Sequence, residues 1–332
     1  MRRVGIKDVA RVAGVSVGTV SNVVNARTSV AEEYVLRVQA AIDELGFVTN
    51  DSARQLKAGS SSTVGLVVLS GSNPFFASLG EEVETVAEEH GLSALLASSA
   101  QQPERERRYV ELFERQRVRG LLVAPIAGTP EYLSAVHQRG TPVIVLGESA
   151  GDGFCWTMVD TELGGYLAAR HLLASGRRRI AFVGGPRAQV RDRIEGAQRA
   201  VNEFAEASLR VIDTNDLTMD EGRTAGEWIG QLPENERPDG VFAANDVTAI
   251  GVLNALIRHE HLSIPQDIAV VGHDDIDVAT STLVPLTTIR QPIDLVARAG
   301  LDLLVREAEE GVGHVHSHSV LAPSLVIRDS AP

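Results

Sequence analysis

The sequence predicts an all-α helix-turn-helix head followed by a larger α/β core with two lobes of doubly wound parallel sheet. Before Gly46, three short segments have the apolar spacing of helices, and Gly14 separates the first two. From Thr63 onward, apolar runs rich in β-forming residues alternate with stretches of helical period, which is typical of parallel sheets covered on both faces. About ten such runs are too many for one ordinary sheet, so we expect two lobes that divide near Asp160.

Charge is distributed unevenly along the chain. The 332 residues are 44% hydrophobic, which is ample for a buried core, and the net charge is −13. That sign excludes a protein that coats nucleic acid with its whole surface. Residues 1–59, however, hold eight basic and six acidic side chains, a net +2, and the rest of the chain carries −15. This distribution permits a local DNA contact by the head and leaves the core acidic.

Targeting and redox features point to the cytoplasm. Cys155 is the single cysteine, which excludes an internal disulfide framework and fits a reducing compartment. No apolar segment follows Arg2 and Arg3 as it would in a signal peptide. No run approaches the ~18 uninterrupted apolar residues of a membrane span. We therefore expect a cytoplasmic protein that has no membrane partner.

The head is predicted to contain three helices. The first begins near Ile6, and the second runs from its N-cap Ser16 to about Asn25. The third follows "SVAE", where Ser29 and Glu32 have the spacing of a capping box. The apolar faces of the three helices comprise Val9, Ala10 and Ala13, then Val20, Val23 and Val24, and finally Val35, Val38, Ile42 and Leu45.

Three short helices with a glycine-containing turn between the first two form the helix-turn-helix arrangement. In that geometry the second helix enters the major groove with its N-terminus first, which would place Val17, Gly18, Ser21 and Asn22 near DNA. Asn22 can bond an adenine in bidentate fashion, and Val17 can contact a thymine methyl group. Spacing alone equally allows a small helical cap that packs on a larger domain.

The segment after the head predicts a conditional helix. "NDSARQLKAG", Asn50 to Gly59, has an N-cap and two turns, and it runs into the flexible linker "SSST". Isolated helices shorter than ~12–15 residues are marginal in water. We therefore expect this segment to become helical only when something packs against it.

Several motifs recur in order along the whole chain: "IKDVARVAGVSVGTVSNVVN", "AAIDELGF", "ARQLKAG", "NPFF", "RRRIAFVGGP", "AND", "SIPQDIAVVGHDD" and "PLTTIRQP". Together they resemble the LacI/GalR repressors. The resemblance implies a periplasmic-binding-protein-like core, in which the chain crosses back to the first lobe near Pro292 and returns to the second near Val320. The domains expected on this basis are a helix-turn-helix domain at 1–48, a hinge helix and linker at 49–62, an N-terminal lobe at 63–160 plus 292–319, and a C-terminal lobe at 161–291 plus 320–332.

The resemblance also implies how the hinge acts. In that family the hinge helices of two subunits pair on DNA, and a leucine from each wedges into the minor groove at the centre of a palindrome. Leu56 stands at the matching position, where an apolar wedge unstacks a base step and gains a bent, better-wrapped duplex; the alternative is a buried contact to the core. The expected DNA-binding residues are Ser16, Val17, Gly18, Thr19, Ser21, Asn22, Asn25, Asn50, Arg54, Leu56 and Lys57.

The head departs from the family pattern at a few positions. A larger polar pair often stands where this chain has Val17 and Gly18, and Arg or His often stands at Asn22, so fewer side-chain donors remain to read base edges. Ala31 replaces a usual capping serine, for which Ser29 can substitute.

Polar residues at the ends of predicted strands indicate a ligand site, because open parallel sheets bind ligands outside the carboxyl ends of their strands. Asn245 and Asp246 follow one strand, Asp274 and Asp275 follow another, and Arg193 lies after the loop that follows a third. These residue types offer the mixed donors and acceptors that sugar hydroxyls need.

The resemblance implies effector contacts from Arg193, Asn245 and Asp274, and an aromatic ring pressed on the ligand from Phe75–Phe76. For Asn245 the alternative is a cap on the next helix, although we expect Asp246 to be that cap. Other pocket positions differ from the family: Gly147 stands where an acid is usual, Glu148 where an arginine is usual, and Arg223 near a site that is often aromatic. The effector's identity therefore does not transfer.

Other signals favour ordinary structural roles. In "HVHSH", His314, His316 and His318 share a period of two and could face one way, but no neighbouring Cys or second cluster accompanies them, so we predict no metal site and no cofactor. "GGP" lacks the spacing of a nucleotide-binding loop, and no GxSxG occurs. Cys155 follows Phe154 in an apolar run, which is typical of a packed thiol. We predict no catalytic residue.

These features predict a homodimeric repressor that binds palindromic operator DNA and is switched by a small molecule, a sugar. A purine-type corepressor is the alternative within that class. From other classes, a solute-binding protein is disfavoured by the head and hinge, and an enzyme by the lack of a nucleophile–base constellation or cofactor loop. The chain ends without a heptad repeat, so we expect a dimer.

Overall fold

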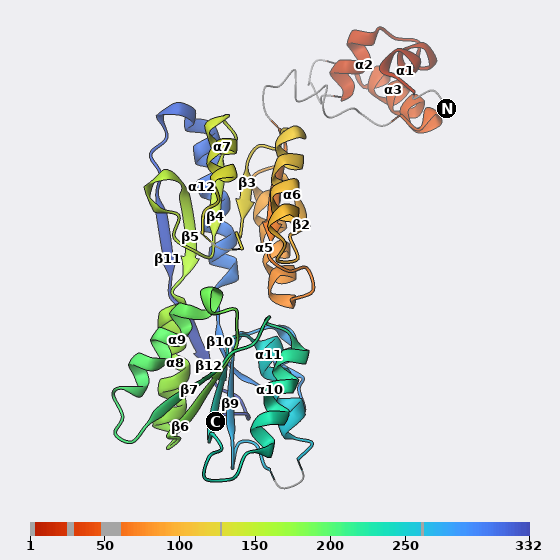
Figure 1. Ribbon diagram of the computed structural model, residues 1–332. Coiled ribbons are helices and arrows are strands. Elements are labelled where there is room, and N and C mark those ends of the chain that lie inside the picture. The colour runs from red at the N-terminus through yellow and green to blue at the C-terminus, as the bar shows by residue number, and fades with distance from the viewer. Residues whose placement is uncertain (1–3, 25–29, 48–60, 127, 260–261) are drawn as a thin grey trace. The chain divides into compact units, whose positions relative to one another are not determined.

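The computed structural model describes residues 4–24, 30–47, 61–126, 128–259 and 262–332. The chain divides into two compact units, residues 1–60 and 61–332 (Figure 1). We describe each unit by itself, the first as the head unit and the second as the core unit. In the described residues no helix is long and apolar enough to cross a membrane.

The head unit contains three helices, α1 (Ile6–Ala13), α2 (Val17–Val24) and α3 (Glu32–Leu45). Gly14 and Gly46 end α1 and α3 in the left-handed conformation that glycine adopts without a steric penalty, as the sequence predicted. The small core comprises Val9, Ala10, Ala13, Val20, Val38 and Ala41, with Ile6, Val15, Val23, Val24, Ile42, Leu45 and Phe47 packed against it.

Two expectations for α3 are wrong. Glu32 is the first residue of the helix and Ala31 its N-cap, without a side-chain cap hydrogen bond, so Glu32 does not stand at the third position that a capping box with Ser29 requires. Val35 is exposed rather than part of the apolar face. Arg37 connects α3 to α1 by donating to the carbonyl oxygen of Ala13 at 2.7 Å. Glu33, one turn earlier in α3, forms an ion pair with Arg37 at 3.9 Å.

The first lobe of the core unit has a sheet in the order β11-β5-β4-β3-β1-β2, in which every paired strand is parallel. Buried residues of α5 and α12 pack on one face, and those of α6 and α7 on the other. The strands are β1 (Thr63–Val68), β2 (Ser93–Ser98), β3 (Leu121–Val123), β4 (Val143–Leu146), β5 (Cys155–Val159) and β11 (His318–Leu321). The helices are α5 (Pro74–Glu89), α6 (Pro103–Arg115), α7 (Glu131–Gln138) and α12 (Ile293–Glu310), with short turns η1 (Gly151–Gly153) and η3 (Gly311–Gly313).

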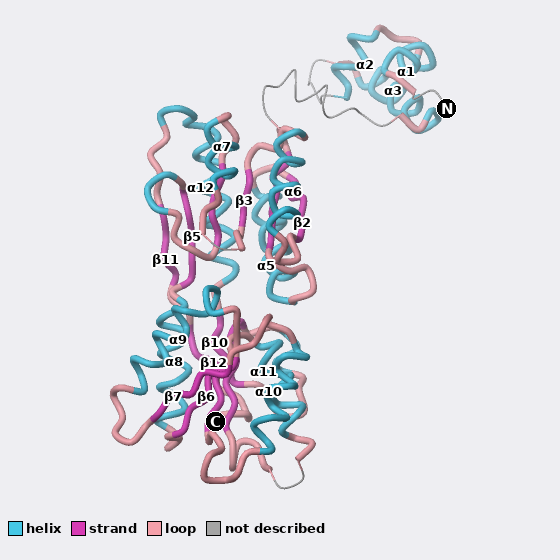
Figure 2. The backbone as a smooth tube through the Cα atoms, in the orientation of Figure 1, coloured by secondary structure: helices cyan, strands magenta, loops and turns pink. Residues whose placement is uncertain are grey.

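The second lobe repeats this plan in a sheet ordered β12-β10-β9-β8-β6-β7, in which the edge pair β10–β12 is antiparallel and the other pairs are parallel. Figure 2 shows the strands of this lobe in magenta, with its helices in cyan on either side. Helices α10 and α11 cover one face, and α8 and α9 the other. The strands are β6 (Arg179–Val183), β7 (Ser208–Ile212), β8 (Gly240–Ala243), β9 (Ala269–Asp274), β10 (Thr287–Arg290) and β12 (Ser324–Val326). The helices are α8 (Thr161–Ala174), α9 (Arg187–Val201), α10 (Met219–Gln231) and α11 (Asp246–Leu256), with the turn η2 (Asp277–Thr280).

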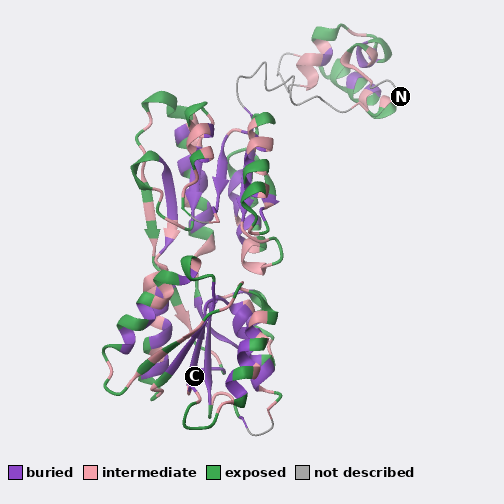
Figure 3. Cartoon of the chain, viewed as in Figure 1, coloured by how far each residue is buried: buried purple, intermediate pink, exposed green. Residues whose placement is uncertain are grey.

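The central strands of both sheets are buried on both faces, which explains why they read in sequence as continuous apolar runs (Figure 3). The expected two-lobed, doubly wound α/β fold is confirmed. The chain leaves the second sheet after β10 and enters α12 of the first lobe at Ile293, then returns between β11 and β12. This return follows Leu321, close to the expected Val320, because Val320 and Leu321 still pair in β11 with Met158 and Val159 of β5.

Candidate functional site

The two lobes meet at residues that follow the carboxyl ends of their strands. Asn73, after β1, caps α5 by accepting from the backbone N–H of Phe75 at 3.0 Å. The ring of Phe75 then packs against the hydrophobic core of the second lobe, whereas Phe76 packs against that of the first. The two rings contact edge to face, with centroids 5.2 Å apart. This aromatic pair therefore lies where the ends of the two sheets come together.

A hydrogen-bonded bridge also crosses between the lobes. Gln101, just after β2, donates to Asp216 at 2.7 Å and accepts from Gln189 of α9 at 2.7 Å. Asp216 follows β7 in the second lobe. This bridge was not predicted from the sequence, although the rule that polar residues at strand ends gather in the cleft would have selected Gln101 and Asp216.

Arg193 of α9 and Asp274, the last residue of β9, form the charged centre of this region. Arg193 donates to the carbonyl oxygen of Ala244 at 2.9 Å, and its Nε atom is buried with no hydrogen-bond partner among the described residues. Burial lowers the pKa of Arg193, and the nearby Asp274 opposes that shift. Conversely, burial raises the pKa of Asp274 to about 7, against the lowering influence of Arg193 and of Gln291, which donates to Asp274 at 2.7 Å.

Backbone geometry adds to the individuality of Asp274. Its φ of 122° lies in a region that L-residues rarely adopt, and such strain is found where surrounding contacts over-determine a conformation. The neighbouring His273 is fully buried, and burial lowers its pKa well below the usual range, so it is a neutral imidazole. Its Nδ1 lies 3.1 Å from the Asp274 carboxylate.

The helix cap after β8 is Asn245 and not Asp246, which corrects the sequence analysis. Asn245 accepts from the backbone N–H of Thr248 at 2.9 Å and is 2% exposed, so the capping role that the sequence left open for it is real. Asp246 instead holds the lobe together: it accepts from Thr288 of β10 at 2.5 Å and from the backbone N–H of Ile276 at 2.9 Å. Burial, together with the neighbouring Asp274, raises the pKa of Asp246 to about 7.

The positions that differ from the family pattern have local partners. Glu148, after β4, accepts from the backbone N–H of Gly128 at 3.3 Å, and burial raises the pKa of its carboxyl group. Arg223 of α10 forms an exposed ion pair with Glu227 at 2.8 Å. Gly147 has a φ of 85°, a left-handed backbone that disfavours the acidic side chain usual at this position.

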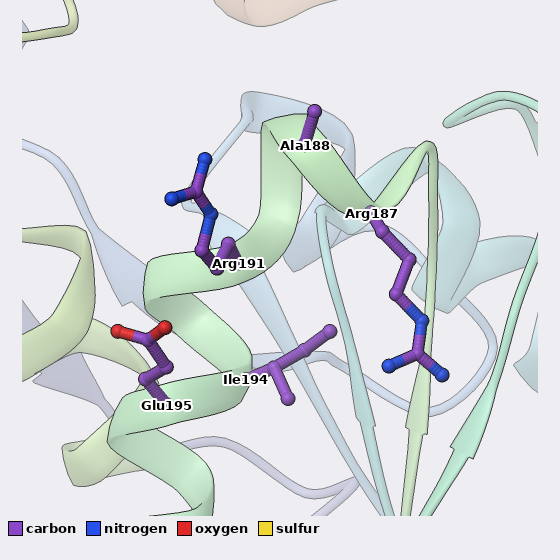
Figure 4. A pocket seen from close by; sticks show the side chains of 5 residues that line it. All are labelled: Arg187, Ala188, Arg191, Ile194 and Glu195. Atoms are coloured by element: carbon purple, nitrogen blue, oxygen red, sulfur yellow. The ribbon is translucent and has the colours of Figure 1, made fainter.

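A separate open hollow of about 370 Å³ lies on the exposed face of α9, lined by Arg187, Ala188, Arg191, Ile194 and Glu195 (Figure 4). Arg187 is held there by a two-pronged ion pair with Asp213, at 2.5 and 3.0 Å. None of the predicted effector contacts lines this hollow, so it is distinct from the Arg193–Asp274 centre.

In the head unit, Ser16 caps α2 as predicted, by accepting from the backbone N–H of Thr19 at 3.0 Å. Ser16, Val17 and Gly18 are exposed at the start of α2, while Thr19, Ser21 and Asn22 are half-buried. The start of α2 thus presents a surface to solvent, and its role in DNA contact stays a prediction. Asn25, Asn50, Arg54, Leu56 and Lys57 lie outside the described residues.

The histidines of "HVHSH" do not face one way, and two of them join residues distant in the sequence. His318 stacks on Trp156, with ring centroids 4.3 Å apart. His314 and His316 instead face Cys155 and Glu307, and the four potential ligand atoms all lie within 4.8 Å of one another. The sequence predicted no metal site because these two partners come from β5 and α12. Cys155 is buried, as expected.

Comparison with known proteins places these features in context. Residues 5–50 match the sequence profile of bacterial regulatory proteins of the lacI family, and residues 169–331 match that of a periplasmic binding protein-like domain. The ribose operon repressor of Escherichia coli (strain K12) is 35% identical over 98% of this chain and 99% of its own length.

Two further similarities extend over almost the whole chain. The HTH-type transcriptional repressor PurR of Vibrio atlanticus (strain LGP32) is 32% identical over 92% of both chains. A crystal structure of the lac repressor dimer bound to operator and the anti-inducer ONPF is similar in fold, with a TM-score of 0.84, 27% identity and 99% of each chain covered.

Proposed function

This chain belongs to the LacI family of bacterial regulatory proteins and is a transcriptional regulator, and we propose that it is a homodimeric repressor of palindromic operator DNA whose affinity is switched by a sugar bound between its lobes. The head unit would read the operator through the start of α2 and through the hinge at 49–62. The cleft at the carboxyl ends of the two sheets would hold the sugar.

The observation that carries the effector half of this proposal is the Arg193–Asp274 centre. Arg193 has a buried Nε donor with no hydrogen-bond partner in the described part of the chain, beside the buried carboxylate of Asp274. A buried donor left unpaired costs free energy, which a ligand acceptor recovers. Phe75, at the same junction of the lobes, offers an apolar ring face. A guanidinium, a carboxylate and an aromatic ring together suit the hydroxyls and the C–H face of a sugar.

Asn245 contributes less than the sequence suggested. Its side-chain oxygen is used by the helix cap, and its amide nitrogen lies 3.4 Å from the Leu217 carbonyl oxygen, a long hydrogen bond. We propose that its amide nitrogen turns to the effector, while Arg193 and Asp274 supply most of the binding energy. Phe76 supports Phe75 rather than the ligand, since its ring belongs to the first-lobe core.

A purine-type corepressor is the second candidate, favoured by the 32% identity to PurR and by the aromatic pair at the cleft. The two candidates differ in sign as well as chemistry. A ligand that loosens operator binding must bind better to the state with low DNA affinity, and a corepressor must bind better to the state with high DNA affinity. In each case the ligand changes the affinity for DNA by the same factor by which DNA changes the affinity for the ligand.

A thermal-shift screen of the purified protein against monosaccharides, disaccharides, sugar phosphates and purines tests the effector half. A ligand at about 100 times its dissociation constant stabilises the folded state by about 2.7 kcal/mol. We expect Arg193→Ala to weaken binding of the ligand found by about 10- to 100-fold, because it removes charge-assisted hydrogen bonds. Arg191→Ala, on the exposed face of the same helix, is the matched control. Equal losses in both variants, or none, would remove Arg193 from the site.

Operator binding tests the DNA half independently. Leu56→Ala should weaken specific operator binding about tenfold or more, since the wedge that stabilises the kinked duplex is lost. Binding of the effector to the same variant should be nearly unchanged. Unaltered operator affinity would exclude the wedge, and a parallel loss of effector binding would indicate a folding defect instead.

The proposal assigns binding rather than catalysis to the cleft, and its DNA target places the protein in the cytoplasm. The lobe boundaries that go with it are 63–160 with 292–321 for the first lobe and 161–291 with 322–332 for the second. The first lobe begins at residue 63, directly after the hinge and linker, so a change in lobe closure reaches the hinge through a covalent connection.

A further inference from the structure

A compact group of metal-ligating side chains lies at the end of the first lobe away from the cleft. Cys155 is the first residue of β5, so it lies at the amino end of the parallel sheet. His314 and His316 lie in the link between η3 and β11, and Glu307 is in the last turn of α12. Pairing of β11 with β5 brings residues about 160 positions apart in sequence into one cluster, which we name the C155 cluster: Cys155, Glu307, His314 and His316.

Four of the six distances between the ligand atoms can be compared with those of a tetrahedral site, and all six are within 4.8 Å. Sγ of Cys155 lies 3.0 Å from Nε2 of His314 and 3.8 Å from Nδ1 of His316. Oε2 of Glu307 lies 3.8 Å from the same His314 nitrogen and 3.9 Å from the same His316 nitrogen. In a tetrahedral zinc site, bond lengths of about 2.0–2.3 Å separate the ligand atoms by about 3.3–3.8 Å. The cluster therefore needs adjustments of only a few tenths of an ångström for most of these contacts.

Outer partners orient the ligand atoms toward one point. His314 has its other nitrogen, Nδ1, 2.7 Å from the carboxylate of Glu310, which leaves Nε2 for the cluster. His137 contacts Oε1 of Glu307 at 2.7 Å, which leaves Oε2 for the cluster. Metal-ligating histidines commonly hold a carboxylate or carbonyl group with the second ring nitrogen, and that contact fixes the ring and its tautomer.

The cluster is largely buried, and one of its ligand atoms lacks a hydrogen-bond partner in the described residues. The side chains of His314 and Glu307 are 3% and 5% exposed, and Cys155 is fully buried. Oε2 of Glu307 is buried and has no hydrogen-bond partner among the described residues. A buried carboxylate oxygen without a hydrogen-bond donor is costly, and a cation at the centre of the cluster would offset that cost.

We propose that Cys155, Glu307, His314 and His316 bind a zinc ion in a closed structural site. The donor set of one thiolate sulfur, two imidazole nitrogens and one carboxylate oxygen suits zinc, whereas magnesium and calcium take oxygen ligands. Four protein ligands leave no open position, so the ion is structural. On binding, the Cys155 thiol releases its proton to solvent and the thiolate coordinates the ion. The ion would join the end of α12 and the edge strand β11 to β5.

Zinc content measured on the full-length chain tests this site. The protein is stripped with a chelator, incubated with zinc chloride, desalted and analysed for bound zinc by mass spectrometry. We expect about one zinc per chain in the wild type and near zero in Cys155→Ala and His316→Gln, because three remaining ligands hold zinc far more weakly. His318→Gln is the matched control, since this histidine belongs to the same motif but stacks on Trp156.

Cobalt substitution reports on the thiolate directly. Cobalt added to the stripped wild type and to His318→Gln should produce a sulfur-to-metal charge-transfer absorption that Cys155→Ala lacks. His316→Gln changes a partly exposed side chain and keeps the test decisive if Cys155→Ala fails to fold. A wild type that retains no zinc, or variants at Cys155 and His316 that retain as much as the wild type, would overturn the proposal.

Discussion

Two buried polar clusters of the core unit lie at opposite ends of their sheets and differ in how their charge is balanced. At the cleft, past the carboxyl ends of the strands, the carboxylate of Asp274 has Arg193 as its counter-charge. In the C155 cluster, past the amino ends of β5 and β11, the ion-pair partners of Glu307 among the described residues are imidazoles: those of His137, His314 and His316.

The difference indicates what each cluster is suited to bind. At the cleft, Arg193 supplies the positive charge beside Asp274. The hydrogen-bonding atoms of these two side chains that remain unused are directional and favour a polar organic ligand. In the C155 cluster, where nitrogen, sulfur and carboxylate ligand atoms converge and the described partners of Glu307 are imidazoles, a metal ion is suited to balance the charge of the carboxylate. In the two proposals, buried carboxylates serve different functions, and the source of the positive charge distinguishes them.

The largest expected effect is a loss of stability on substitution of Asp246. This test distinguishes the structural carboxylate of Asp246 from that of Asp274, which is proposed to bind the ligand. Asp246→Ala leaves the buried backbone N–H of Ile276 and the hydroxyl of Thr288 without their acceptor. Each unpaired group costs about 1–3 kcal/mol, so urea unfolding should show a loss of about 2–5 kcal/mol. Asp277→Ala, which changes an exposed carboxylate nearby, is the control. A loss no greater than that of the control would contradict the structural role.

The C155 cluster also shows the limits of what could be predicted from the sequence. Period two indicated that His314, His316 and His318 could face one way, but only the first two face the cluster, and His318 stacks on Trp156. The cysteine and the glutamate that complete the cluster are supplied by strand pairing and by the last turn of α12. No local pattern encodes such a contact between distant segments, so the absence of a nearby cysteine was misleading.

Prediction succeeded where a local rule applied. Alternation of apolar runs and helical periods predicted both doubly wound lobes, and Ser16 was identified as the N-cap of α2 from its residue type and position. The rule of strand ends placed Arg193 and Asp274 in one region. The two candidate caps of α11, Asn245 and Asp246, are adjacent in the sequence, so a local rule could not choose between them. In the structure Asn245 is the cap, and Asp246 accepts from the hydroxyl of Thr288, which is remote in sequence.

A smaller effect sharpens the comparison at the C155 cluster. Glu310→Gln removes the charge that orients His314 without removing a ligand. Loss of such an outer partner typically weakens metal affinity about 10- to 100-fold, and we expect competition with a zinc chelator to show a loss in that range. Glu309→Gln, whose carboxylate pairs with Arg119 on the surface, should match the wild type. Identical chelator competition by both variants would mean that Glu310 does not position the histidine.

The smallest expected effect is the pH dependence of stability at the cleft. Because the folded-state pKa of Asp274 is raised to about 7 from about 3.9 in the unfolded chain, its contribution is fully present below about pH 4 and is lost as the pH rises through about 7. Between about pH 5 and 7, the free energy of unfolding should therefore fall with pH more steeply in the wild type than in Asp274→Asn. We expect a difference of about 1 kcal/mol per pH unit.

Urea unfolding at pH 5, 6, 7 and 8 measures this difference, with Asp277→Asn as a variant that should keep the wild-type slope. Arg193 is essential to the interpretation. It lowers the pKa of Asp274, so Arg193→Ala should move the loss of stability to higher pH rather than abolish it. If Asp274→Asn retained the wild-type slope while Arg193→Ala shifted nothing, the two charges would not act on each other. The cleft would then lack the internal counter-charge that distinguishes it from the C155 cluster.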